Sequence, residues 1–276
     1  MISNQFENEW RMGMEFCSIY SGSSGNCLYV ASDHTKILVD SGLTGKKIQE
    51  GLKEIGVDPA ELDAMVITHE HVDHIKSAGI LSRRYNIPIY ANTKTWEAMV
   101  NSLGQVSDEN IRVFEEYNAF EIGDILVQPF EIPHDAACPC GYSFMHEGNK
   151  ISIATDIGYV TEEIKANISN ANLILLEANH DVEMLKVGPY PYSLKRRVLS
   201  NKGHLSNEDA GKAIVEILGP KTKKVILGHL SKTNNYPELA LRTVISVLQM
   251  NGIIDGEHIE IDIASRDRVG RVQSVK

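Results

Sequence analysis

The run His69-x-His71-x-Asp73-His74 constrains this 276-residue chain more than any other part of its sequence. It follows the apolar stretch 65–67, so the four side chains lie where a strand ends, which is where α/β active sites form. Four imidazole and carboxylate groups within six residues exceed what one closed tetrahedral site draws from a single loop. The run therefore predicts half of a hydrolytic centre with two divalent metal ions per chain. We expect zinc or manganese, although iron fits the same ligands.

Three later apolar runs each lead into a further potential ligand, namely His134, Asp156 or His229. A single buried histidine is more often a satisfied core residue than a ligand, so His134 or His229 alone would not indicate a metal site. Together with the earlier run, however, the three residues predict the other half of the centre. The remaining histidines outside this context are expected at the surface: His34, His146, His180 and His258.

The composition is that of an ordinary globular protein with a sizeable core, at 42% hydrophobic and 23% charged residues. No apolar run approaches the length of a membrane-spanning helix, and charged residues stand where a signal peptide would be hydrophobic. We therefore expect a cytoplasmic protein without membrane insertion. Residues 1–13 are polar and unpatterned, and we interpret them as an N-terminal extension to one domain, residues 14–276.

Helical and strand-like segments mix along the whole chain, which predicts an α/β fold. Amphipathic stretches at 44–55 and 238–250 predict helices, and Gly252 ends the second. Between residues 111 and 132, two strands joined by a turn at Gly123 favour a mixed sheet over a purely parallel one. Short apolar runs rich in β-branched residues predict further strands at 27–30, 36–39, 64–67, 87–90, 151–154, 173–176, 225–227 and 258–263.

The net charge of -10 argues against unspecific binding of polyanions over the whole surface, but it permits a local cationic groove with bound metal ions. The four cysteines are too few and too unevenly spaced for a disulfide scaffold. Cys138 and Cys140 form a lone C-x-C pair that could clasp a metal or act in redox chemistry. Because no second pair accompanies them, we favour simple packing in a loop.

His204 lies just ahead of a predicted helix, whose start is indicated by the capping-box pair Ser206 and Asp209. Backbone N–H groups and the dipole at such a helix start favour an anion such as phosphate. His204 is therefore a candidate catalytic residue. Spacing alone leaves a solvent-facing loop histidine as an equal alternative.

A basic segment with interleaved aromatic residues precedes His204 in this otherwise acidic chain. Lys195, Arg196 and Arg197 could hold phosphates while Tyr192 stacks on a base. A short run of charge is also typical of a solvated face, and that alternative stays open.

The stretch 21–26 is rich in glycine and serine and lies between two predicted strands. Ser24 and Asn26 could offer polar groups to a phosphate at the rim of a pocket. The alternative is an ordinary turn between the two strands, which the same composition favours.

Taken together, these motifs resemble the metallo-β-lactamase-fold hydrolases, with the closest likeness to the YycJ/WalJ group. The likeness extends from residue 15 to the C-terminus and includes the stretches 21–26, 38–42, 68–74, 203–207 and 227–231. It implies an αββα sandwich, in which two mixed β-sheets are flanked by helices, around a dinuclear metal site. By the family's assignments, one metal takes His69, His71 and His134, the other takes Asp73, His74 and His229, and Asp156 bridges them.

RNase Z and the PhnP phosphodiesterases are similar around His204. In them, a histidine before the corresponding helix serves as proton donor or phosphate ligand. In RNase Z a glutamate after the fourth-motif strand orients that histidine, and Glu177 matches this position. The alternative for Glu177 is an ordinary carboxylate at a strand end.

The YycJ/WalJ likeness implies a dinuclear-metal phosphodiesterase, and more specifically a 5′-to-3′ exonuclease whose partner is DNA. A metal-bridging hydroxide would attack phosphorus, His204 would protonate the leaving oxygen, and Glu177 would hold the His204 tautomer. Asp73 then counts as a catalytic residue as well as a ligand. The gene neighbourhood of the group further implies a functional link to a bacterial cell-wall two-component system.

Three alternatives share the same metal ligands. A small cyclic phosphodiester could be the substrate, or a thioester as in glyoxalase II. The chain could instead be a regulatory module with an idle metal site, but seven intact ligand positions argue against that interpretation.

Overall fold

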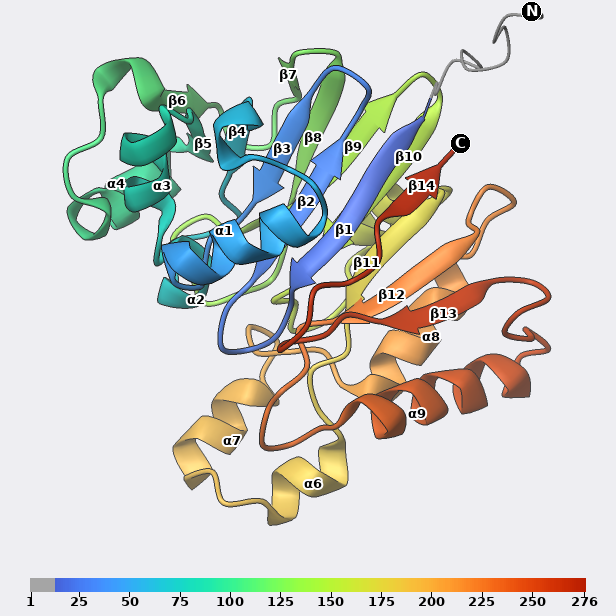
Figure 1. Ribbon diagram of the computed structural model, residues 1–276. Coiled ribbons are helices and arrows are strands. Elements are labelled where there is room, and N and C mark those ends of the chain that lie inside the picture. The colour runs from blue at the N-terminus through green and yellow to red at the C-terminus, as the bar shows by residue number, and fades with distance from the viewer. Residues whose placement is uncertain (1–12) are drawn as a thin grey trace, which may run out of the picture.

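The computed structural model describes residues 13–276 (Figure 1), so the predicted N-terminal extension falls outside the described residues except for Gly13. The described residues form two mixed β-sheets of seven strands each. The first sheet has the order β14 (Gln273–Val275), β1 (Met14–Tyr20), β2 (Cys27–Ala31), β3 (Lys36–Val39), β4 (Ala64–Val66), β5 (Ile89–Asn92) and β6 (Ile111–Phe114). The second has the order β13 (Glu260–Ile263), β12 (Lys224–Gly228), β11 (Leu173–Glu177), β10 (Asn149–Ala154), β9 (Cys140–His146), β8 (Ile125–Glu131) and β7 (Phe120–Ile122).

The two sheets pack face to face, and helices cover their outer faces (Figure 1). One apolar cluster lies between the sheets and draws on strands of both, as the predicted αββα sandwich requires. The outer face of the first sheet is covered by α1 (Gly45–Glu54), α3 (Ala78–Tyr85) and α4 (Thr93–Leu103). The outer face of the second is covered by α5 (Glu162–Ile168), α8 (Asn207–Ile217) and α9 (Pro237–Met250).

Two further helices, α6 (Val182–Val187) and α7 (Tyr192–Val198), project from the lower edge of the sandwich in Figure 1. They connect β11 to α8. Short 3-10 helices span Pro59–Glu61 and Asp108–Asn110. A last short helix, α2 (Val72–Ile75), follows β4 and contains part of the candidate ligand run predicted from the sequence.

The strand directions explain why the candidate ligands meet. β10, β11, β12 and β13 are mutually parallel, and β8 runs in the same direction because both β8 and β10 are antiparallel to β9. Their carboxyl ends therefore share one edge of the second sheet. The end of β4 is tied to that edge across the sandwich, since Cys140 N donates to the Thr68 carbonyl at 3.1 Å and Tyr142 Oη donates to the Ile67 carbonyl at 2.6 Å.

The turn at Gly123 joins β7 to β8 as the sequence predicted. Gly123 has φ +55°, and a Cβ there would lie 2.0 Å from Thr35 Oγ1, so this turn requires glycine. Its neighbour Asp124 accepts hydrogen bonds from the hydroxyls of Ser32 and Thr35, each at 2.6 Å. These hydrogen bonds join the β7–β8 hairpin of the second sheet to the β2–β3 turn of the first.

The predicted helices 44–55 and 238–250 correspond to α1 and α9, where Thr44 caps α1 by accepting from Lys47 N. The strands predicted at 87–90 and 258–263 are displaced, since β5 begins and ends two residues later and β13 starts two residues later. The sequence did not predict β6, β9 or β14. Among residues 13–276, no helix combines the length and apolar character needed to cross a membrane.

All four cysteines are buried and unpaired. The Cys138 carbonyl accepts hydrogen bonds from Asn92 Nδ2 at 2.8 Å and Thr95 Oγ1 at 3.3 Å, and the Cys138 thiol lies 3.5 Å from Tyr117 Oη. Burial raises the pKa of the Cys140 thiol far above its ordinary value. These contacts agree with the expected packing in a loop for Cys138, whereas Cys140 is the first residue of β9 and does not lie in a loop.

Candidate metal centre

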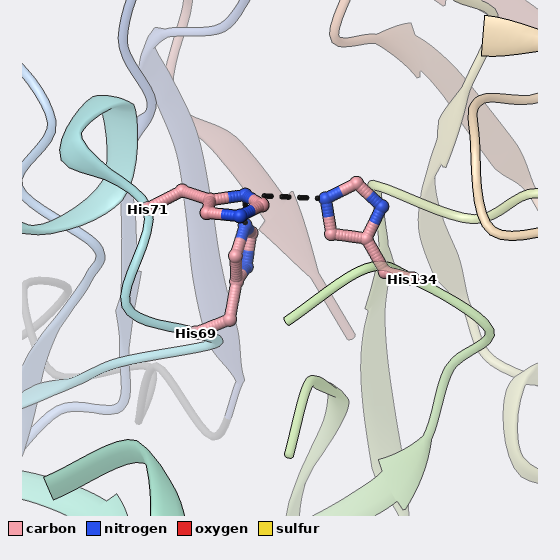
Figure 2. A group of neighbouring side chains, drawn as sticks. All are labelled: His69, His71 and His134. Atoms are coloured by element: carbon pink, nitrogen blue, oxygen red, sulfur yellow. Dashed lines mark hydrogen bonds between the residues drawn. The ribbon is translucent and has the colours of Figure 1, made fainter. Parts of the chain in front are cut away.

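The first half of the site is formed by three imidazoles whose nitrogens face one another (Figure 2). His69 Nε2 lies 3.1 Å from His71 Nδ1, and His71 Nδ1 lies 3.3 Å from His134 Nε2. Zinc–nitrogen bonds of about 2.0 to 2.1 Å in tetrahedral geometry separate ligand nitrogens by about 3.3 Å. The spacing of these three nitrogens therefore fits a single divalent cation between them.

The second half lies beside it and is built around the buried carboxylate of Asp156. Asp156 Oδ2 lies 3.3 Å from His74 Nε2, and Asp156 Oδ1 lies 3.3 Å from His229 Nε2. Asp73 Oδ2 lies 3.6 Å from His74 Nε2, and His134 Nε2 lies 3.8 Å from Asp156 Oδ1. Asp156 thus lies between the two groups of histidines and within 4 Å of members of both.

Burial and charge shift the pKa values of these groups in opposite directions. Burial disfavours the charged imidazolium of His69 and His134 and lowers both pKa values. Burial also acts against His74, but Asp40 and Asp156 outweigh it and hold the His74 pKa well above its ordinary value. Burial acts against the Asp156 carboxylate, yet His229 and His74 hold its pKa well below the usual range. A buried carboxylate among imidazoles is a donor set suited to divalent cations.

The ligand run changes structure in its middle. His69 lies just after β4, His71 is the N-cap of α2, and Asp73 and His74 lie in the first turn of that helix. His69 and His74 are fully buried, whereas the Asp73 side chain retains 31% of its exposure. The single loop predicted from the sequence is therefore a strand exit followed at once by one helical turn.

Asp40 supports the centre from the end of β3, although the sequence analysis did not name it as a site residue. Its carboxylate accepts from Thr68 N at 2.9 Å, from Thr68 Oγ1 at 2.9 Å and from His74 Nδ1 at 2.7 Å. Such a partner fixes the tautomer and orientation of a metal-binding histidine. The sequence did carry one signal for this role, since Asp40 follows an apolar strand just as the ligands do.

Three residues of the site adopt left-handed backbone conformations that non-glycine residues seldom use. They are Asp40 with φ 59°, Asp156 with φ 59° and His229 with φ 55°. Such conformations cluster at functional sites, where the surrounding structure holds them in place. Asp40 and His229 lie directly after a strand and Asp156 lies two residues after one, so each unusual turn directs its side chain toward the shared edge of the sheets.

Ser24 and Asn26, the predicted rim residues of the stretch 21–26, occupy different environments. Asn26 is buried, and its Nδ2 lies 3.2 Å from His74 Nε2 while its Oδ1 accepts from Gly22 N at 3.2 Å. Ser24 is exposed at the tip of the loop. The structure therefore places Asn26 against a candidate ligand and leaves only Ser24 open to solvent.

His204 and Glu177 form the pair that the sequence analysis expected. His204 Nδ1 lies 2.8 Å from Glu177 Oε1, and the fully buried Glu177 also accepts from Ile157 N at 2.7 Å and Leu205 N at 3.3 Å. The His204 ring lies 5.4 Å from the rings of both His134 and His229. Burial acts against the imidazolium, but Glu177 outweighs it and raises the pKa of His204 to about 9.

The predicted basic segment forms α7, and its cations have different partners. Arg197 donates to Asp135 through Nε at 2.5 Å and through Nη2 at 2.8 Å, which ties α7 to the His134 loop. Lys195 Nζ donates to the carbonyl of Lys186 at 2.7 Å. Arg196 is exposed, as is Tyr192, and the guanidinium lies 6.0 Å from the Tyr192 ring.

One prediction about the histidines is wrong. His180 is buried, not exposed, because the chain leaving β11 pairs as a β-bridge with Ser206 at the start of α8. Burial lowers the pKa of His180 to about 4. His34 and His258 are exposed as expected, and His146 is partly buried against the Asp124 carbonyl at 2.9 Å.

Comparison with known proteins agrees with this geometry. The beta-lactamase superfamily domain matches residues 35–230. Exodeoxyribonuclease YycJ of Bacillus anthracis is 44% identical over 250 residues, covering 91% of this chain and 95% of that protein. Exodeoxyribonuclease WalJ of Streptococcus pneumoniae is 47% identical over 239 residues, covering 86% of this chain and 89% of that protein.

Among solved structures, the metallo-beta-lactamase fold protein YhfI from Bacillus subtilis superposes with a TM-score of 0.72 at 17% identity, covering 95% of this chain and 99% of that one. At this identity the likeness concerns the fold alone. The two exodeoxyribonucleases support a closer family assignment, because the alignments cover 89 to 95% of their length. The chain therefore belongs to the beta-lactamase superfamily, within the YycJ/WalJ group of its metallo-β-lactamase-fold hydrolases.

Proposed function

We propose that this protein is a metal-dependent exodeoxyribonuclease that removes nucleotides from the 5′ end of DNA. The observation that carries the proposal is the 2.8 Å contact between His204 and Glu177 beside the metal centre, in a chain 44% identical to a named exodeoxyribonuclease. A phosphodiester has a poor leaving group, and a positioned proton donor next to a metal centre suits its cleavage.

Seven residues would hold two divalent ions, zinc or manganese by expectation and iron as a further fit. His69, His71 and His134 would hold one ion, and Asp73, His74 and His229 the other, with Asp156 between them. When bound, the ions supply the Lewis acidity that activates water and stabilises negative charge on the phosphodiester oxygens. The nitrogen and carboxylate donor set supports all three metals equally.

His204 would donate a proton from Nε2 to the leaving oxygen. Glu177 would hold the opposite nitrogen, Nδ1, and so fix the tautomer that presents the proton. Glu177 is itself held by the backbone N–H groups of Ile157 and Leu205, so the pair has little freedom to reorient. These contacts favour His204 as a proton donor over a solvent-facing loop histidine.

The exposed face of α7 would bind the strand being cleaved. Arg196 and Tyr192 lie side by side there, in an arrangement that suits a backbone phosphate and a stacked base. Lys195 and Ser24 would add weaker polar contacts at the rim. Arg197 is engaged by Asp135, so we assign it to holding α7 in place before any contact with DNA.

The experiment compares the metal-loaded protein on four substrates: 5′-labelled DNA, a 2′,3′-cyclic nucleotide, a glutathione thioester and bis-p-nitrophenyl phosphate. We expect DNA to be cleaved with the highest kcat/KM. The His204→Ala variant should lose about 100- to 10,000-fold in kcat on DNA, as expected for loss of a general acid. It should lose far less on bis-p-nitrophenyl phosphate, whose leaving group departs without a proton.

His34→Ala is the matched control, because His34 is exposed and its ring has no role in the proposal. Equal DNA cleavage by wild type and His204→Ala would refute the proton-donor assignment. Preferred turnover of the thioester or the cyclic nucleotide would refute the nuclease proposal itself.

A further inference from the structure

Three buried asparagines connect the chain segments that carry Glu177, His204 and His229. Asn179, Asn207 and Asn235 each retain at most 4% of their exposure. They lie two residues after Glu177, three after His204 and six after His229. None of them is a candidate ligand, and the proposed chemistry uses none of them.

Asn235 is the centre of this asparagine cluster. Its Nδ2 donates to the carbonyls of Ala178 at 2.9 Å and Asn179 at 3.1 Å. The same amide pairs reciprocally with that of Asn207, with Nδ2–Oδ1 distances of 2.8 and 3.0 Å. The Asn235 Oδ1 also accepts from Tyr236 N at 3.0 Å. One side chain thus joins the Glu177 segment, the His204 segment and its own.

Asn179 completes the connection toward the metal centre. Its Nδ2 donates to the His229 carbonyl at 2.8 Å, its backbone N–H donates to the Leu205 carbonyl at 2.8 Å, and its carbonyl accepts from Ser231 N at 2.8 Å. His229 has a left-handed backbone, φ 55°, which needs such support. The cluster therefore holds a strained ligand segment and the His204 segment against the same strand end.

The rings of His204 and His229 reflect this constraint, since their centroids lie 5.4 Å apart with planes inclined by only 16°. A proton donor misplaced by about 1 Å loses about 100-fold in rate. Buried amides that satisfy several carbonyls at once are costly to remove, because the carbonyls are left unpaired. Asn235 and its partners therefore link the segment of His204 to the segment of His229.

We propose that Asn235 is a positioning residue that sets His204 relative to His229. The inference rests on the proposed role of His204 as proton donor to the leaving group. Asn235 is distant in sequence from His204, and the distance between the His204 and His229 rings depends on it.

The test measures kcat and KM of metal-loaded Asn235→Ala on DNA and on bis-p-nitrophenyl phosphate. We expect kcat on DNA to fall about 10- to 100-fold with little change in KM, and kcat on bis-p-nitrophenyl phosphate to stay within about threefold. Asn235→Ser, whose hydroxyl keeps one donor, should fall between wild type and Asn235→Ala. It also supplies a readout if the alanine variant folds poorly.

Asn251→Ala is the matched control, because Asn251 also donates to a backbone carbonyl but lies exposed at the far end of α9. Suppose that His204→Ala loses activity on DNA only. If Asn235→Ala then loses activity equally on both substrates, or on neither, the positioning role of Asn235 is refuted while the proton-donor role of His204 stands. If His204→Ala itself keeps full DNA cleavage, the proton-donor proposal fails instead.

Discussion

At Asp40, one carboxylate orients two parts of the metal centre. It fixes Thr68 at the end of β4 through two hydrogen bonds and His74 in α2 through a third. The Thr68 hydroxyl in turn lies 3.0 Å from His69 Nδ1. Two candidate ligands therefore depend on a residue that is not itself a candidate ligand.

Asp40→Asn should lower the affinity for the divalent ion about 10- to 100-fold, as loss of a histidine-orienting partner does at other metal sites. The amide keeps the shape of the side chain but cannot accept from every current donor. Competition with a chromophoric chelator measures the affinity. Asp33→Asn, an exposed carboxylate near the β2–β3 turn, is the control and should match wild type. Unchanged affinity in Asp40→Asn would show that His74 is oriented by something else.

Residue types and spacing predicted the candidate ligands, but not the residues that orient them. His134, Asp156 and His229 each follow an apolar run, so sequence alone could mark them. Asn235 carries no such mark, because its partners lie just after β11 and at the start of α8 and become its neighbours only on folding. The burial of His180 was missed for the same reason, since a bridge to Ser206 decides it.

At the scale of elements, close packing between the β3 exit and α2 positions the ligand run. Ser41 N donates to the His74 carbonyl at 2.7 Å, and Asn26 N donates to the Asp73 carbonyl at 2.9 Å. A Cβ at Gly42 would lie 1.5 Å from the Asp73 carbonyl oxygen. This contact leaves no space for any side chain at residue 42.

Gly42→Ala should therefore displace α2, lower the metal content and reduce the free energy of unfolding by about 1 to 3 kcal/mol, as overpacking does. Elemental analysis and thermal unfolding measure the two effects. Gly45→Ala is the matched control three residues later, where a Cβ meets nothing closer than 3.7 Å. A Gly42→Ala variant with full metal content and an unchanged Tm would contradict this account of the packing.

β9 is one of the strands that the sequence failed to predict, because its residues do not show the usual pattern of a buried strand. Cys140–His146 contains glycine, serine and cysteine where a buried strand usually has β-branched residues. Ser143 is nonetheless buried, because its Oγ pairs with Ser152 Oγ at 2.7 Å and donates to the Asn167 carbonyl at 3.0 Å. Gly141 is needed because a Cβ there would lie 2.4 Å from the Phe130 ring. Both explanations involve partners on other elements.

For the whole molecule, the metal centre depends on both sheets. Four of the seven candidate ligands follow β4 of the first sheet, and the other three follow β8, β10 and β12 of the second. Neither sheet alone could assemble the site. The α/β class and the sandwich architecture were foreseen from the sequence and its resemblance, and the matched superfamily domain confirms them. The sequence alone could not predict how the two sheets are positioned relative to each other.

We propose that the candidate metal centre cleaves DNA with the help of divalent metal ions. The most direct measurement follows release of a 5′-labelled nucleotide from DNA by chelator-treated protein before and after addition of zinc, manganese or iron. The account predicts no release without metal, restored release with at least one of the three ions, and no release by Asp73→Ala under the same conditions. Cleavage that persists in the chelator, or in Asp73→Ala, would contradict it.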